Sequence, residues 1–234
     1  GTKGETGTAN IAWTIASYSG STAGDYTATG VLTLPTGWTG TAGNVTATVR
    51  VTKANVPDSI SVGGKTLNST TPYLVDGTPA TTGTLGDGNC TAHFDPLTGV
   101  LSLQDYVGGV IRINETGKDL SIKLIGDANK ITGGQFGIYN DSGDIHITSD
   151  TEASLEIDQT APGAGAAIVT GWQGFGTGSV IISGKANVKA TSQSTSGYIN
   201  GIQAREDVII QDEASFDITL EVTGYEAKGI SSTG

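Results

Sequence analysis

The chain has 234 residues and a formal net charge of −11, with 36 glycines and only 15% charged residues. Gly and β-branched residues weaken helices, so this composition favours many short strands joined by tight turns. The excess of acid argues against nucleic acid as a partner, because such a binder needs Lys and Arg to neutralise phosphate. No apolar run approaches the roughly 18 residues of a membrane-spanning helix, so we expect no membrane insertion.

Residues 1–53 are predicted to form a first β unit. Alternating apolar and polar residues indicate strands at 25–34 and 44–52, preceded by a short strand at 13–15. Four segments resemble the C-terminal half of a bacterial immunoglobulin-like domain: Ile11–Trp13, Ala23–Thr27, Val31–Pro35 and Val45–Val49. The resemblance implies a partial immunoglobulin-like β unit of the kind found along bacterial surface proteins.

Residues 54–108 are predicted to be a cap made of hairpins. The first hairpin spans 59–67 around Gly63-Gly64, and the second spans 91–103, with a loop to about residue 88 between them. Open solenoid ends expose apolar stacks, so we expect this segment to cover one end of a repeat structure. The single cysteine, Cys90, cannot form an intrachain disulfide, and on an alternating strand its side chain faces away from that of His93.

An imperfect repeat runs from about residue 109 to residue 234. Four isoleucines, each after a small residue and about 30 residues apart, mark it: Ile138, Ile168, Ile202 and Ile230. Between the markers recur two further apolar segments, which begin near Ile145 and Ala153 in the first repeat. A period of this length built from three short β segments predicts a solenoid. We place Gly137 and Gly201 at its corners, where a missing Cβ relieves the bend.

Two phrases of the repeat region, Asp119–Ile131 and Gly137–Tyr139, resemble a family of bacterial surface proteins described as carbohydrate-binding domains. Members of that family are right-handed parallel β-helices, distantly like pectate lyases in shape. The resemblance covers about residues 57–234. It implies an all-β chain in which a right-handed parallel β-helix, residues 54–234, follows the partial immunoglobulin-like unit.

Aromatic residues near corners are the candidates for glycan binding, because an aromatic face can stack on a sugar ring. The candidates are Trp172, Tyr139, Tyr198 and Tyr225. Local packing is the alternative for Trp172 and for its neighbour Phe175, in the longest corner of the repeat. Phe136 and Phe216 are expected in the core, and His146 is expected on the surface.

Acidic residues at corners raise the question of a calcium site, since Ca²⁺ is bound by several oxygen ligands. Asp141, Asp144 and Asp207 are the metal candidates, within a wider set that also holds Asp150, Glu152, Asp212 and Glu213. Ser179 interrupts the series formed by Asp144 and Asp207. The alternative is that these carboxylates satisfy the backbone of turns. No other cofactor is expected.

These features favour a non-catalytic adhesion or glycan-binding module of a larger bacterial protein, extracellular and secreted or held at the cell surface. Its partner would be a polysaccharide, a host or cell-surface glycan, or a protein. Two alternatives stay open: a structural stalk or protein-adhesion segment, and a Ca²⁺-dependent polysaccharide lyase. Arg205 is the one coil arginine after Arg112 that could serve such a lyase as its base.

Overall fold

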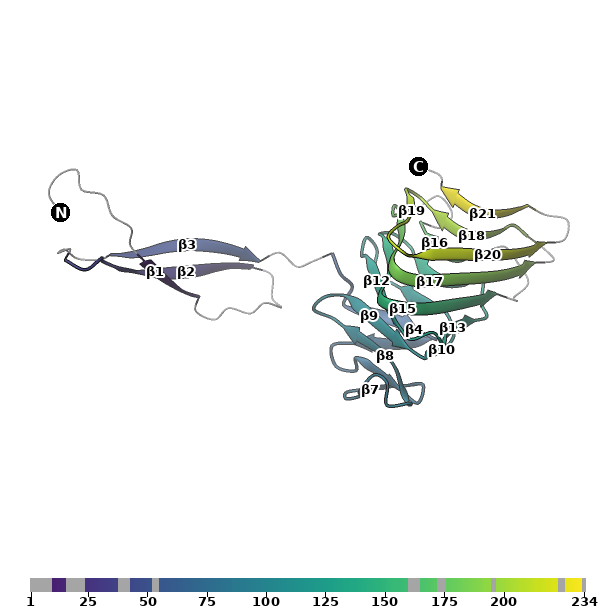
Figure 1. Ribbon diagram of the computed structural model, residues 1–234, viewed down its shortest axis with the longest axis horizontal. Coiled ribbons are helices and arrows are strands. Elements are labelled where there is room, and N and C mark those ends of the chain that lie inside the picture. The colour runs from purple at the N-terminus through teal and green to yellow at the C-terminus, as the bar shows by residue number, and fades with distance from the viewer. Residues whose placement is uncertain are drawn as a thin grey trace. The chain divides into compact units, whose positions relative to one another are not determined.

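The computed structural model describes residues 10–15, 24–37, 43–51, 55–159, 165–171, 176–194, 197–222 and 226–232. Within these ranges the chain forms strands and turns and no helix, which confirms the all-β prediction. It divides into two compact units, residues 1–54 and 55–234 (Figure 1). Among the described residues, no helix long and apolar enough to cross a membrane is present.

The first unit is a three-stranded antiparallel sheet in the order β1-β2-β3. Its strands are β1 (Asn10–Ile15), β2 (Gly24–Thr33) and β3 (Asn44–Val51). The register pairs Trp13 with Gly30 and Gly30 with Val45, which gives one apolar face, while Thr14, Thr29 and Thr46 share the other. Trp13 is 49% exposed, so the apolar face presents large side chains to solvent.

The second unit contains two sheets that enclose one core. The seven-stranded sheet consists of β4 (Ser59–Val62), β5 (Lys65–Asn68), β11 (Ile111–Ile113), β14 (Phe136–Asn140), β16 (Gly165–Thr170), β18 (Ile199–Ala204) and β21 (Ala227–Ser232). The eleven-stranded sheet consists of β6 (Tyr73–Val75), β7 (Thr78–Ala80), β8 (Cys90–Asp95), β9 (Val100–Gln104), β10 (Val107–Gly108), β12 (Leu120–Ile125), β13 (Asn129–Thr132), β15 (Ile145–Gln159), β17 (Val180–Ser194), β19 (Val208–Ile210) and β20 (Ser215–Val222).

From β11 onward the chain alternates between the two sheets, and from β12 onward each new strand pairs in parallel with the one from the previous pass. In the seven-stranded sheet Ile138 pairs with Ile168, Ile168 with Ile202, and Ile202 with Ile230. The long strands β15 and β17 pair along both of their halves, with a register shift between Ser149 and Ala153. Figure 1 shows the resulting stack, with β15, β17 and β20 one above another.

Hairpins occupy the edge of both sheets where the parallel stack begins. The predicted hairpins are present as β4–β5 and β8–β9, which pair antiparallel, and β9 joins β12 in parallel. The segment predicted as a loop to about residue 88 contains a further hairpin, β6–β7. Its turn is Asp76-Gly77, both at positive φ (49° and 69°), which is the dipeptide that favours such a turn. Phe94, Leu101 and Leu103 are fully buried in this region.

Gly137 and Gly201 lie inside strands β14 and β18, so their predicted placement at corners is wrong. In β14 the consecutive residues Gly137 and Ile138 are both buried. Gly137, like Ile138, faces the opposite sheet. A Cβ on Gly137 would lie 2.3 Å from Ile157 Cγ2 and 2.8 Å from the Ala167 carbonyl oxygen. Close packing between the sheets, rather than a bend, therefore requires the small residue.

We expect Gly137→Ala to lower the free energy of unfolding by about 1 to 3 kcal/mol, because the added methyl group overpacks the core. Gly229→Ala is the matched control, since its Cβ would meet only Ile218 Cγ2, at 3.8 Å. Urea denaturation followed by circular dichroism measures both variants. Equal stability of the two would contradict the packing explanation.

Tyr106 is a buried tyrosine whose hydroxyl donates a hydrogen bond to the Gly109 carbonyl oxygen at 3.0 Å. Burial raises its pKa from 10.0 to about 12. Between these two pH values the unfolded chain releases the phenol proton while the folded chain retains it. Folding stability that is present below pH 10 is therefore lost as pH rises toward 12, by about 2 to 3 kcal/mol.

We expect the urea midpoint to fall between pH 10 and pH 12, and to fall less in Tyr106→Phe than in the wild type. Tyr139 has a similarly raised pKa, so part of the decline remains in that variant. Parallel pH profiles for the two proteins would show that Tyr106 does not titrate as its burial requires.

Candidate functional site

A hollow of about 660 Å³ lies beside strands β4, β11 and β14, within the size range of small-molecule sites. We call it the aromatic hollow. Its lining residues are Ser61, Gly64, Val110, Arg112, Asn114, Gln135, Phe136 and Tyr139. The alternation of buried and more exposed residues along β11 and β14 places it on the face of the sheet turned away from the core.

Strand register brings the main residues of the aromatic hollow together from distant parts of the sequence. Arg112 pairs with Ser61 on one side and with Tyr139 on the other. Their neighbours Ile111 and Ile138 are fully buried, so the core fixes the backbone beneath these side chains. Ser61, Arg112 and Tyr139 are thus held by regular strands, while Gly64, Val110, Asn114 and Gln135 line the hollow from positions just outside strands.

Phe136 and Tyr139 form a stacked aromatic pair, with ring centroids 5.1 Å apart and planes at 20°. Three residues apart on a regular strand they would face opposite ways, but Gly137 and Ile138 both turn inward and restore them to one face. Phe136 is half-buried in this pair, so its predicted place in the core is wrong. Phe216 is also only partly buried, although it packs against the core.

The Tyr139 ring is held by its hydroxyl, which donates a hydrogen bond to Asp141 Oδ1 at 2.7 Å. Partial burial, and after it this bond to the carboxylate, raise the pKa of Tyr139 to about 12. The phenol therefore keeps its proton, and its bond to Asp141, to higher pH than an ordinary tyrosine. This arrangement fixes the ring, which suits it as a binding platform.

Polar side chains surround the aromatic pair. Arg112 is exposed and donates a hydrogen bond from Nε to Asn114 Oδ1 at 2.6 Å. Gln135 is exposed as well, and it contributes an amide to the same lining. The hollow thus combines an apolar platform with donors and acceptors, the combination that orients a polar ligand.

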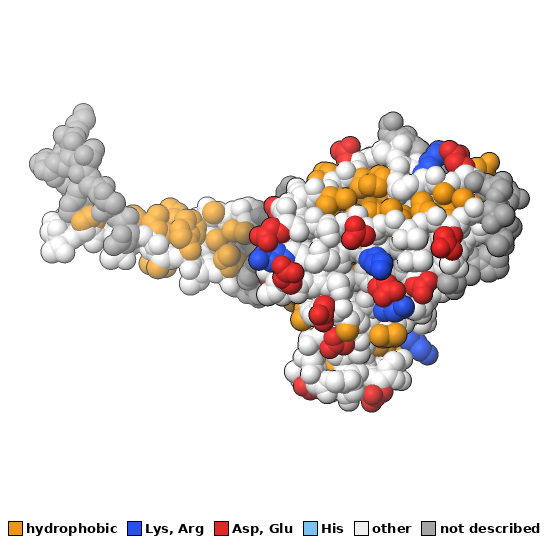
Figure 2. Space-filling view, turned by 45° about the vertical axis from the view of Figure 1, so that its right-hand side comes forward, with side chains coloured by type: hydrophobic (Ala, Val, Ile, Leu, Met, Phe, Trp, Pro, Cys, Tyr) orange, Lys and Arg blue, Asp and Glu red, His pale blue; other side chains and the backbone are white. Residues whose placement is uncertain are grey.

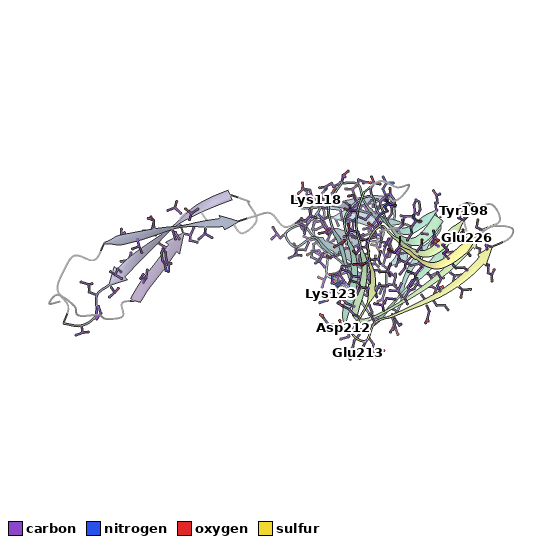
Figure 3. All side chains as sticks on the ribbon, turned by 90° about the horizontal axis from the view of Figure 1, so that it is seen from above. Lys118, Lys123, Tyr198, Asp212, Glu213 and Glu226 are labelled. Carbon is purple, nitrogen blue, oxygen red and sulfur yellow. The ribbon has the colours of Figure 1, made fainter. Side chains whose placement is uncertain are left out.

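Tyr198 lies in a second hollow of about 370 Å³ on the same sheet, beside β18 and β21. The ring is 59% exposed. Figure 3 shows Tyr198 and Glu226 close together, far from Asp212 and Glu213. Lys228 Nζ lies 3.4 Å from Glu226 Oε1, so the cation of this hollow is already paired.

The structure does not unite the four aromatic candidates in one site. Tyr139 and Tyr198 line different hollows, with strand β16 between β14 and β18. Val169 of β16, which pairs with Tyr139, is fully buried. Trp172, Tyr225 and Phe175 lie outside the described residues.

Two of the three metal candidates, Asp144 and Asp207, belong to a corner ladder formed by Asp119, Asp144, Ser179 and Asp207. Asp119 Oδ1 accepts a hydrogen bond from the Asp144 N–H at 2.9 Å, and Asp144 Oδ1 accepts one from the Ser179 N–H at 2.8 Å. Ser179 Oγ accepts from the Asp207 N–H at 3.3 Å, so serine continues the ladder. These contacts satisfy corner backbone, the role considered as the alternative to a metal site.

Asp141, the third metal candidate, is instead the acceptor for Tyr139. Within the described ranges, no three His, Cys, Asp or Glu side chains are grouped so that they could hold a metal ion. His146, predicted to be exposed, is partly buried and lies 2.8 Å from Ser183 Oγ through Nε2. The prediction of an exposed His146 is therefore wrong, because Ser183 on the neighbouring strand β17 lies beside the ring.

Sequence reasoning found Tyr139 but missed Arg112, Asn114, Gln135 and Phe136. The alternation of Ile111, Arg112 and Ile113 was the available signal, because it turns the arginine outward. Comparison with known proteins gives no match, whether to a family model, to a curated protein or to a solved structure.

Proposed function

We propose that this chain is a non-catalytic glycan-binding module that acts in adhesion at a bacterial cell surface, and that the aromatic hollow is its binding site. The observation that carries the proposal is the stacked, partly exposed pair Phe136–Tyr139 beside Arg112, Asn114 and Gln135. Sugar rings present C–H groups to an aromatic face and hydroxyls to polar side chains. The hollow offers both kinds of contact, with the two rings and Arg112 on strands and with Asn114 and Gln135 next to strand ends.

We further propose that residues 55–234 form a right-handed parallel β-helix, and that the first unit is part of an immunoglobulin-like sandwich. Parallel pairing of each pass with the next, around one continuous core, supports the β-helix. The apolar face of the β1-β2-β3 sheet supports the sandwich, because such a face is normally covered by a second sheet.

Binding is favoured over catalysis by the use of the carboxylates. Asp144 accepts a backbone N–H of the next corner, and Asp141 accepts the Tyr139 hydroxyl. A lyase would need free acidic groups close to a group that accepts a proton, and the Arg112 guanidinium in the aromatic hollow is a positively charged hydrogen-bond donor. The residues around the hollow therefore suit recognition better than bond cleavage.

Protein adhesion is the second candidate, and the apolar surface of the last strands favours it. Ile209, Ile210 and Ile230 are exposed. Figure 2 shows apolar side chains gathered over the upper part of the second unit, at the height where Figure 1 places β19 to β21. Exposed apolar patches of this kind are typical of protein contacts.

A glycan array probed with the whole chain, in Ca²⁺ and in chelator, tests the proposed function. We expect reproducible hits that persist in chelator, because the aromatic hollow contacts its ligand through aromatic, amide and guanidinium groups. Hits lost in chelator would instead support a calcium site among Asp141, Asp144 and Asp207. A blank array would overturn glycan binding and leave protein adhesion as the better candidate.

A further inference from the structure

Arg112 has no acidic partner among the described residues, whereas several lysines of the second unit form ion pairs. Among the described residues no carboxylate forms an ion pair with it, and its Nε is bonded to a neutral amide oxygen of Asn114. By contrast, four lysines of the same unit have acidic partners within 4 Å: Lys123, Lys130, Lys185 and Lys228. The guanidinium therefore carries an uncompensated positive charge in a chain of net charge −11.

The position of Arg112 directs that charge at a ligand in the aromatic hollow. It occupies the strand position between Ser61 and Tyr139, and all three line the hollow. With Nε engaged by Asn114, the two terminal nitrogens keep their donors for another group. A guanidinium presents such donors as a planar fork that matches the two oxygens of a carboxylate.

We infer that the aromatic hollow selects sugars that bear a carboxylate, with the sugar ring against Tyr139 and Phe136 and the carboxylate on Arg112. This inference rests on the proposed glycan-binding function and adds the class of ligand. Asp141 keeps its negative charge while it accepts the Tyr139 hydroxyl, so the Arg112 contact with the ligand must outweigh repulsion from this carboxylate. The second hollow lacks this selectivity, because Glu226 already neutralises Lys228.

Because the chain is acidic overall, we expect its affinity for an acidic glycan to depend on the length of that glycan. A net charge of −11 repels a long polyanion, while a short acidic oligosaccharide meets mainly the local charge of Arg112. Short acidic glycans are therefore the better probes. Salt should screen the overall repulsion and the Arg112 contact alike, so binding is best compared at one fixed ionic strength.

The test uses two copies of one array of short glycans, the second with its uronic and sialic acid carboxyls converted to methyl esters. We expect the whole chain to bind acidic glycans on the first copy and to lose at least tenfold in signal on the second. Equal hits on both copies would overturn the carboxylate inference and leave glycan binding intact. A blank on both would overturn the proposed function itself.

Arg112→Gln tests whether Arg112 is the group that recognises the carboxylate. We expect it to lower affinity for the acidic hits about tenfold, and to lower affinity for any neutral hit by a smaller factor, because a neutral sugar loses a hydrogen-bond donor but no charge partner. Lys185→Gln is the matched control, because it removes the same charge from a lysine paired with Glu213 on the eleven-stranded sheet. An equal loss in both variants would show that total charge, not the aromatic hollow, governs acidic binding.

Discussion

Tyr139→Ala is expected to lower affinity for the bound glycan about thirtyfold, equivalent to about 2 kcal/mol. The substitution removes the ring that stacks on Phe136 and leaves Asp141 without its hydrogen-bond donor. Because Tyr139 faces away from the core, the strands should remain folded. Isothermal titration of the whole chain with the strongest glycan from the array measures the loss, and circular dichroism checks the fold.

Two variants separate the ring of Tyr139 from other effects. Tyr139→Phe keeps the aromatic face and loses only the bond to Asp141, so we expect it to retain most of the affinity. Tyr198→Ala removes an exposed aromatic ring from the second hollow and should leave the affinity unchanged. If Tyr198→Ala abolished binding and Tyr139→Ala did not, the aromatic hollow would be the wrong site.

Asn129→Ala is expected to produce the largest loss of stability, about 2 to 4 kcal/mol of unfolding free energy. Asn129 is a buried amide between the ends of several strands. Its Oδ1 accepts from the Tyr106 N–H at 3.2 Å, and its Nδ2 donates to the carbonyl oxygens of Ile125 and Ser154, both at 3.1 Å. Truncation would leave these backbone groups without a partner in a place shielded from water.

The control for Asn129 is Asn187→Ala. Asn187 is only partly buried, and its Oδ1 accepts one side-chain hydrogen bond, from Ser215 Oγ at 2.7 Å. We expect a loss below about 1 kcal/mol, since solvent can replace that partner. Urea denaturation of both variants at pH 7 decides the matter. A loss for Asn129→Ala no larger than that for Asn187→Ala would show that the hydrogen bonds of the buried Asn129 amide do not stabilise the fold.

Local patterns in the sequence identified most strands because period-two alternation is a property of neighbouring residues. The hairpins at 59–67 and 91–103 carried such signals, and the structure contains both. The hairpin at Asp76-Gly77 was missed because its strands have only three residues each. Alternation over so short a stretch cannot be told from an irregular loop.

The candidate site was harder to predict because it depends on which strands become neighbours. Ser61, Arg112 and Tyr139 meet through pairing between distant segments, and no local pattern specifies that register. The role of Gly137 was hidden for the same reason, since the group that excludes a side chain there is Ile157 of the facing sheet. Inward packing of Gly137 in turn places Phe136 beside Tyr139, which alternation alone would have kept apart.

The aromatic hollow is the proposed binding site for glycan. The most direct measurement is a nuclear magnetic resonance titration of the whole chain with the strongest glycan from the array. We expect the largest amide shifts in β4, β11 and β14, around Ser61, Arg112 and Tyr139. Shifts confined to β18 to β21, with none around Arg112 and Tyr139, would contradict the claim.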